Sequence, residues 1–220
     1  MSDRFMAQRR ALIERMGERG IRDLDILRAF DLVPRHDFVP QAVWHRAYED
    51  APLPIGFGQT ASQPSLQALY MQLLEIGPRD KVLEIGTGSG FQTAVLAHLA
   101  DRVYSVERIR ELSVRARDAI DRQRLSNVAL LVGDGTVGWS RYAPYDAILV
   151  AAGAPEIPPP LMEQLAPGGR MLTPVGTLES QRLVMVRRTA KGWAEEDVLD
   201  CTFVPLLGRF GWNEEGRASR

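Results

Sequence analysis

The sequence is poor in the residues that form disulfides and metal sites. It contains one cysteine, Cys201, and three histidines, His36, His45 and His98. A single cysteine excludes an internal disulfide, and the histidines show no metal-ligand spacing with it or with each other. We therefore expect no metal site. We also expect an intracellular, cytoplasmic protein, because chains without a disulfide framework are typical of reducing compartments.

Long apolar runs and a surplus of one charge are also missing. No run has the length of a membrane span, and the first residues lack the apolar core of a signal peptide. Lys and Arg number 27 against 28 Asp and Glu, so the net charge of −1 gives no electrostatic case for nucleic acid or an anionic membrane. The 220 residues, with 45% hydrophobic content, suit one sizeable globular domain, which we expect to be a monomer.

The N-terminal third divides into helical and irregular parts. Apolar spacing predicts two helices over residues 1 to about 32, then an irregular segment, 33–64, rich in Pro, Gly and aromatic residues. Its apolar content predicts that this segment packs down, and we expect a lid there. A helix after Pro64 ends near Gly77. We expect residues 1–78 to form N-terminal helices and a substrate or lid segment, 79–212 a cofactor-binding core, and 213–220 a polar, frayed tail.

Strands and helices alternate from residue 81 onward. Strands are expected at 82–85, 103–106, 128–132, 147–150, 170–173, 183–186 and 202–204, and helices at 91–100, 111–124 and 161–165. This alternation predicts an α/β fold with a mainly parallel, doubly wound sheet covered on both faces. A hairpin at Gly192 predicts an antiparallel edge. Ligands of such sheets bind beyond the carboxyl ends of the strands.

The run 81–91, Lys-Val-Leu-Glu-Ile-Gly-Thr-Gly-Ser-Gly-Phe, is the most informative part of the chain. It predicts a buried strand, a tight turn and a helix N-terminus, where glycines admit a ligand closely and free N–H groups favour polar or anionic groups. In the dinucleotide fingerprint the third glycine follows the second by three positions, but here Gly90 follows Gly88 by two. This spacing disfavours a dehydrogenase and resembles motif I of the S-adenosylmethionine-dependent methyltransferases, which have a Rossmann-like fold. The cofactor-binding residues predicted in this motif are Glu84, Gly86, Thr87, Gly88, Ser89 and Gly90.

Two further strand ends should meet the same ligand. Glu107 ends the second strand of the alternating region, 21 positions after Gly86, where a carboxylate can accept bonds from both ribose hydroxyls. Gly133-Asp134-Gly135 ends the third, where Asp134 can accept a bond from the adenine amino group. The alternatives are a surface charge at Glu107 and a simple turn at 133–135. Glu84 is a candidate partner for the positively charged methionine end or for the amides of the turn.

Further blocks make the resemblance specific. Upstream lies Gly58-Gln-Thr-Ala-Ser-Gln-Pro64, and far downstream lies Asp200-Cys-Thr-Phe-Val-Pro-Leu206. Ala-Pro-Tyr-Asp at 143–146 and Pro-Val-Gly at 174–176 lie between them. Together with motif I, in this order, they resemble the protein-L-isoaspartate (D-aspartate) O-methyltransferase family over about residues 33–207. The resemblance implies methyl transfer from S-adenosylmethionine to the free α-carboxylate of isoaspartyl residues in damaged peptides and unfolded proteins, and repair through a succinimide.

By this resemblance Ser62 matches the family's active-site serine, in a motif that usually reads Thr-Ile-Ser-x-Pro. Ala61 replaces the isoleucine, and Ser65 stands where the family often has His or Tyr. Ser62 would donate a hydrogen bond that steers the carboxylate, because no histidine is placed to activate it as a nucleophile. The structural alternative is that Ser62 caps the helix after Pro64. The substrate-binding residues implied are Thr60, Ala61, Ala151, Val204 and Pro205.

Three rival functions remain open. The same fold can methylate a carboxylate on one dedicated peptide or a small molecule, and Ala61 and Ser65 permit this. A nucleic-acid amino-methyltransferase is disfavoured, because the run 151–155, Ala-Ala-Gly-Ala-Pro, lacks the Asn or Asp that holds an amino group. From a different class, the chain can be a non-catalytic partner protein that binds S-adenosylmethionine.

Overall fold

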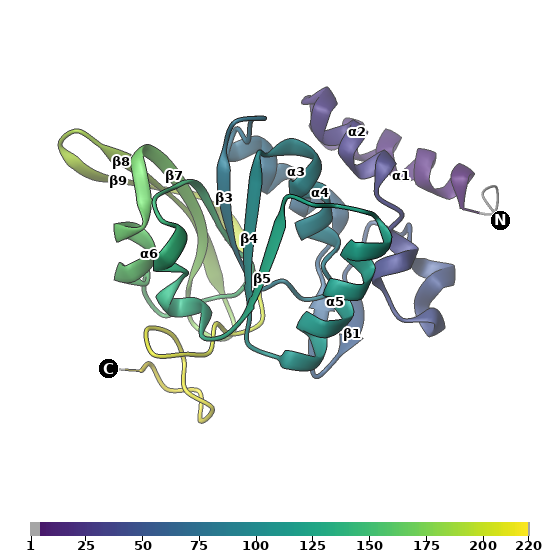
Figure 1. Cartoon of the computed structure of the whole chain (residues 1–220). Coiled ribbons are helices and arrows are strands. Elements are labelled where there is room, and N and C mark those ends of the chain that lie inside the picture. The colour runs from purple at the N-terminus through teal and green to yellow at the C-terminus, as the bar shows by residue number, and fades with distance from the viewer. Residues whose placement is uncertain (1–4, 220) are drawn as a thin grey trace.

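A seven-stranded sheet forms the centre of the computed structural model, which describes residues 5–219 (Figure 1). Its strand order is β5-β4-β3-β6-β7-β8-β9. The strands are β3 (Lys81–Ile85), β4 (Arg102–Glu107), β5 (Val128–Val132), β6 (Tyr145–Val150), β7 (Leu165–Gly176), β8 (Gln181–Thr189) and β9 (Gly192–Cys201). Residues 1–4 and 220, the outer ends of the expected N-terminal segment and tail, lie outside the described residues.

The direction of the strands confirms the expected doubly wound sheet. β3 pairs in parallel with β4 and β6, β4 with β5, and β6 with β7. β7 pairs antiparallel with β8, and β8 with β9, which form the expected antiparallel edge. The chain winds outward from β3 to β5 and then returns to place β6 on the other side of β3. The switch point, where ligands of such sheets bind, therefore lies at the ends of β3 and β6.

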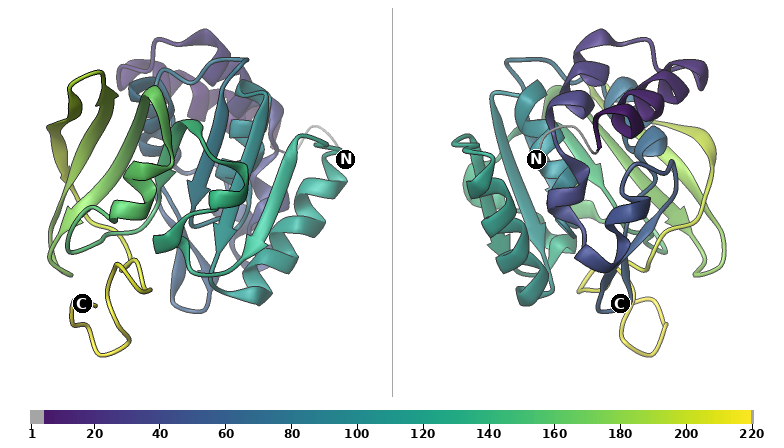
Figure 2. Two further views of the ribbon diagram at one scale, coloured as in Figure 1. Left: turned by 60° about the vertical axis from the view of Figure 1, so that its left-hand side comes forward. Right: turned by 90° about the vertical axis from the view of Figure 1, so that its right-hand side faces the viewer.

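Helices cover both faces of the sheet (Figure 2). α3 (Pro64–Leu73), α4 (Phe91–Leu99) and α5 (Arg110–Arg122) pack on one face, and α6 (Pro159–Glu163) packs on the other. The N-terminal helices α1 (Met6–Glu18) and α2 (Leu24–Leu32) contact α3 and α4. One apolar cluster runs from Leu12 in α1 to Met185 in β8, so the N-terminal helices share the core of the sheet.

The segment 33–64 packs down as predicted. It contains two short 3-10 helices, Arg35–Phe38 and Gln41–Arg46, and the two-stranded antiparallel sheet of β1 (Leu53–Gly56) and β2 (Gln59–Ala61). Tyr48 is buried in the core cluster. The hairpin of β1 and β2 leads directly into α3 and lies beside the glycine turn, since a Cβ on Gly88 would lie 3.4 Å from Cδ1 of Ile55 in β1.

Two expectations for the C-terminal part were wrong. The last strand is β9 (Gly192–Cys201), not 202–204, because residues 192–197 of this edge strand are all exposed and include three consecutive charged residues, so that no alternation of apolar and polar residues is visible. The tail is polar but not frayed over its described residues. The Asn213 side chain accepts hydrogen bonds from the amides of Glu215 and Arg217, and the Ser219 amide donates to the Gly211 carbonyl.

Two classes of feature are absent from residues 5–219. No helix in this range combines the length and the apolar character needed to cross a membrane. Within the same range, no three His, Cys, Asp or Glu side chains are grouped so that they could hold a metal ion.

Candidate active site

The glycine turn connects β3 to α4 as the sequence predicted. Gly86, Gly88 and Gly90 all have positive φ, at 96°, 54° and 84°, a region that side chains other than glycine's disfavour. Gly90 is the N-cap of α4, and a Cβ at this position would lie 2.9 Å from the Cβ of Ala116 in α5. The alternate spacing of the glycines therefore serves both the path of the turn and the close packing of α4 against α5.

An open cavity lies over this turn, at the carboxyl ends of β3, β4 and β6. The predicted cofactor residues that line it are Gly86, Thr87, Gly88, Ser89, Glu107 and Gly135. Ser62 and all five predicted substrate residues, Thr60, Ala61, Ala151, Val204 and Pro205, line the same cavity. Segments far apart in the sequence thus meet at the switch point.

Glu107 lies in the wall of the cavity, with its carboxylate held by the backbone. The Gly88 amide donates to Oε2 at 2.8 Å, and the Ile109 amide donates to Oε1 at 2.9 Å. The side chain is 7% exposed. A carboxylate has about four acceptor positions, so one on each oxygen is left for a ligand. This arrangement suits a pair of neighbouring hydroxyl donors such as those of a ribose.

Glu84 does not line the cavity, and its predicted contacts were wrong. Its carboxylate is fully buried behind the turn, where Gln92 Nε2 donates to Oε1 at 3.0 Å and the hydroxyls of Thr93 and Ser105 donate to Oε2. Burial raises the pKa of Glu84 to about 7, and the three donors oppose that rise. Ser105 also contacts the hydroxyl of Thr87 at 2.5 Å, so Glu84 supports the turn from behind.

Asp134, Gly133 and Gly90 also lie outside the lining of the main cavity, unlike Gly135. The Asp134 carboxylate lines an adjoining hollow at the protein surface. Arg108 and Leu207 line both spaces, so the two are neighbours at this point. The position of Asp134 is compatible with the predicted contact to an adenine amino group. The alternative of a simple turn also fits the local geometry, because Asp134 caps the 3-10 turn that follows it.

Ser62 presents a hydroxyl without a hydrogen-bond partner among residues 5–219. The alternative role of Ser62 as a helix cap is not seen, because the N-cap of α3 is Gln63 and the carboxylate that accepts from the first turn, at the Ser65 amide, is that of Asp50 at 2.9 Å. The Ser62 backbone carbonyl, by contrast, is fixed by Arg35 Nη2 at 3.1 Å. The backbone is therefore held while the hydroxyl stays available to a ligand.

Sequence reasoning missed two buried polar residues at this site. Arg35 is fully buried and donates to the carbonyls of Ala47, Glu49, Ala51 and Ser62, and burial lowers its pKa to about 10. Gln67 in α3 lines the cavity, is 4% exposed, and has an Oε1 atom with no partner among the described residues. The available signal for Gln67 was a polar residue among the apolar positions of a mostly apolar helix.

The chemistry available in this cavity is positioning. Its described lining contains hydroxyls, amides, one carboxylate and one exposed arginine, but no His, Lys or Cys. Ser62 therefore lacks a neighbouring base of the kind that activates a serine nucleophile. The lining fits S-adenosylmethionine, since glycines let the ligand approach the backbone and Glu107 offers acceptors to its hydroxyls.

Comparisons with known proteins agree with this geometry. A protein-L-isoaspartate O-methyltransferase of Geobacter metallireducens is 51% identical over 211 residues, covering 96% of this chain and 98% of that protein. One from Pseudomonas aeruginosa is 50% identical over 200 residues, covering 90% of this chain and 95% of that protein.

Solved structures show the same likeness. One protein-L-isoaspartate O-methyltransferase superposes with a TM-score of 0.86 at 31% identity, covering 92% of this chain and 67% of that chain. A Plasmodium falciparum β-aspartate methyltransferase in complex with S-adenosyl-L-homocysteine has a TM-score of 0.80 at 25% identity, covering 90% of this chain and 98% of that chain. The family model for protein-L-isoaspartate(D-aspartate) O-methyltransferase matches residues 7–211. This chain belongs to the protein-L-isoaspartate(D-aspartate) O-methyltransferase family.

Proposed function

We propose that this chain methylates the free α-carboxylate of L-isoaspartyl residues, and of D-aspartyl residues, in damaged peptides and unfolded proteins. S-adenosylmethionine supplies a methyl group that is already activated by its sulfonium. The observation that carries the proposal is a single cavity that joins Ser62 to the glycine turn and to Glu107. We propose that the protein works as a monomer in the cytoplasm, with residues 1–78 contributing Ser62 and part of the peptide side, and 79–212 contributing the cofactor side and the rest of the peptide side.

The substrate needs orientation, not activation. A carboxylate is ionised at neutral pH, so one of its oxygens can attack the methyl carbon as the carbon–sulfur bond breaks, without a protein base. The bonding electrons go to sulfur, and the products are a methyl ester and S-adenosyl-L-homocysteine. Alignment of reacting groups in a site that excludes water supplies up to about 7–11 kcal/mol in ideal cases.

We assign the alignment to the peptide side of the cavity. The Ser62 hydroxyl donates a hydrogen bond to the substrate carboxylate, while Thr60 and Ala61 on β2 and Ala151, Val204 and Pro205 opposite contact the extended peptide backbone. Most of these contacts are with main chain or small side chains. The site therefore accepts damaged residues in many sequence contexts.

The ester then leads to repair without further help from the protein. Methanol is a better leaving group than the carboxylate oxygen was, so the adjacent backbone nitrogen closes a succinimide ring. Water opens that ring at either carbonyl, and part of the product is normal aspartate.

The proposal is tested through Ser62. In Ser62→Ala we expect kcat for an isoaspartyl peptide to fall at least about tenfold, since one hydrogen bond to a charged group is lost. Binding of S-adenosyl-L-homocysteine should change less than twofold. Thr177→Ala, a hydroxyl deletion on an exposed loop, is the control. Equal turnover by wild type and Ser62→Ala would remove Ser62 from the mechanism.

Two departures from the family pattern favour a test of other acceptors. Ala61 is buried in the cavity wall and is smaller than isoleucine, and the Ser65 hydroxyl is held by Gln63 Nε2 at 2.9 Å. A dedicated acceptor would show as faster transfer to another carboxylate than to generic isoaspartyl peptides. Cofactor binding without methyl transfer to any isoaspartyl peptide would favour the alternative of a non-catalytic partner protein that binds S-adenosylmethionine.

A further inference from the structure

The C-terminal segment 207–212 crosses the open side of the Asp134 turn. We propose that this segment, here called the C-terminal strap, positions the Asp134 carboxylate and thereby sets recognition of the adenine amino group of S-adenosylmethionine. The inference rests on the cofactor site proposed above. It assigns a role to residues that follow the last strand, at the end of the expected core (79–212) and next to the polar tail.

Both oxygens of Asp134 are fixed by protein donors, one of them from the strap. The amide and hydroxyl of Thr136 donate to Oδ1 at 2.8 and 2.7 Å, and the Arg209 amide donates to Oδ2 at 2.8 Å. The Phe210 amide in turn donates to the Thr136 hydroxyl at 3.1 Å. The strap thus holds the carboxylate directly through Arg209 and indirectly through Thr136.

The strap lies so close to Asp134 that only glycine fits at the crossing. A Cβ built on Gly208 would overlap both carboxylate oxygens of Asp134. A Cβ on Gly211 would likewise overlap the carbonyl of Leu206. Any side chain at position 208 must displace the Asp134 carboxylate. A substitution at this position therefore changes the orientation of that carboxylate directly.

The far end of the strap is anchored to the strand on the other side of the cavity. Trp212 Nε1 donates to the carbonyl of Gly153, just beyond β6, at 3.0 Å, and the Trp212 amide donates to Leu206 at 2.8 Å. The Gly208 amide donates back to the carbonyl of Trp212 at 3.1 Å. The strap is therefore a closed loop that ties the end of β5 to the end of β6.

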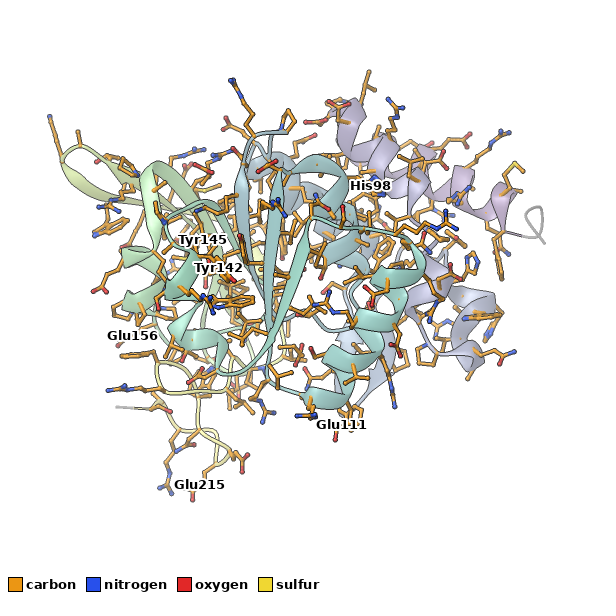
Figure 3. All side chains as sticks on the ribbon, in the orientation of Figure 1. His98, Glu111, Tyr142, Tyr145, Glu156 and Glu215 are labelled. Atoms are coloured by element: carbon orange, nitrogen blue, oxygen red, sulfur yellow. The ribbon has the colours of Figure 1, made fainter. Side chains whose placement is uncertain are left out.

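Its position agrees with the expected place of the adenine. Figure 1 shows the C-terminal segment, in yellow, beyond the carboxyl ends of the strands, and Figure 3 shows Glu111 and Glu215 at that same edge of the molecule. Leu206 and Leu207 line the main cavity beside Gly135, which gives an apolar wall for a flat ring. Three of the roughly four acceptor positions of Asp134 are used, and the remaining one matches a single N–H donor.

The test compares two ligands that differ at the six-position, which Asp134 would recognise, and at the neighbouring ring nitrogen N1, which carries a proton only in the oxo ligand. Titration calorimetry on the full chain measures Kd for S-adenosyl-L-homocysteine, which carries the amino group, and for S-inosyl-L-homocysteine, which carries an oxo group. We expect wild type to prefer the adenosyl ligand at least about tenfold, as for one hydrogen bond to a charged group. Gly208→Ala should weaken adenosyl binding and remove most of that preference.

Two further variants separate positioning from folding. Trp212→Phe keeps an aromatic ring but removes the N–H that donates to the Gly153 carbonyl. We expect it to lower the preference for the adenosyl ligand by about two- to tenfold, as for one neutral hydrogen bond, and so by less than Gly208→Ala. Gly77→Ala, where a Cβ meets no atom within 4 Å, should leave the preference unchanged. The ratio of the two Kd values is the readout, because general loosening of the site would weaken both ligands alike.

The outcomes distinguish the strap from the cofactor site. Wild-type binding with a clear preference that both strap variants retain would overturn the role of the strap and leave the cofactor site standing. Equal Kd values for both ligands in wild type would overturn the contact between Asp134 and adenine, and the strap with it. Absence of binding by wild type would contradict the proposed function itself.

Discussion

The buried guanidinium of Arg35 donates a hydrogen bond of 3.1 Å to the backbone carbonyl of Ser62. The same group also holds the carbonyls of Ala47, Glu49 and Ala51. One side chain therefore fixes four points on the segment that carries the proposed substrate serine. A fully buried cation needs such partners, because removal from water is strongly unfavourable unless hydrogen bonds replace hydration.

The first prediction concerns this arginine. Arg35→Lys keeps the charge but offers three donors to four carbonyls, so we expect the free energy of unfolding to fall by about 2–4 kcal/mol. We expect kcat to fall at least about tenfold, since Ser62 shifts, with little change in cofactor Kd. Urea unfolding and methyl-transfer kinetics measure these effects. Arg28→Lys, at an exposed position, is the control, and equal losses in both variants would contradict the account.

The second prediction concerns Glu107. Glu107→Gln removes the charge and places an N–H where the Gly88 and Ile109 amides need acceptors. We expect Kd for S-adenosyl-L-homocysteine to rise at least about tenfold by calorimetry. Glu111→Gln removes the same charge from an exposed position four residues on and should leave Kd within about twofold. If the two variants bind alike, the assignment of Glu107 is wrong.

The third prediction concerns the tight packing at Gly90. Gly90→Ala places a Cβ 2.9 Å from that of Ala116 at a φ of 84°, so we expect a loss of about 1–3 kcal/mol in unfolding free energy. Cofactor binding should weaken as well, because α4 and the turn move together. Gly17→Ala, where a Cβ meets no atom within 4 Å, is the matched control. Thermal and urea unfolding of both proteins give the comparison.

The fourth prediction concerns pH. Burial raises the pKa of Glu84 to about 7, from 4.5 in the ordinary state. The protonated form is therefore favoured by folding, and this stabilisation is complete below pH 4.5 and is lost as pH rises toward 7. Between pH 5 and 8 we expect wild type to lose about 2 kcal/mol of unfolding free energy relative to Glu84→Gln. Parallel pH profiles of the two proteins would contradict the raised pKa.

The glycine turn and the sheet were predictable because local rules set them. The alternate spacing of Gly86, Gly88 and Gly90 predicts a tight turn in which these glycines adopt positive φ. Apolar runs indicate buried parallel strands. The role of Glu84 was not predictable from proximity in sequence. Side chains alternate along a strand, and Glu84 points toward Gln92 and Thr93 of α4 instead of toward the cavity.

Other parts of the site depend on contacts between distant segments. Nothing local distinguishes Arg35 from the other arginines, since its burial is set by the carbonyls of residues 47–62. The polar composition of residues 213–220 predicted fraying, but the Asn213 side chain and the Ser219 amide are hydrogen-bonded. The strap at 207–212 fell within the expected core, where Trp212 and the glycines at 208 and 211 were the signals for a folded segment. Gln67 was similarly obscured, because its helix was assigned by its apolar residues.

Methyl transfer to isoaspartyl carboxylates is measured with labelled S-adenosylmethionine. A synthetic isoaspartyl peptide and its normal aspartyl isomer are incubated with the full chain, and base-labile label is counted in each. We expect label on the isoaspartyl peptide only, and we expect the amount of that label to be strongly reduced with Ser62→Ala. No label on the isoaspartyl peptide despite measurable cofactor binding, or equal label on both isomers, would contradict the proposed function.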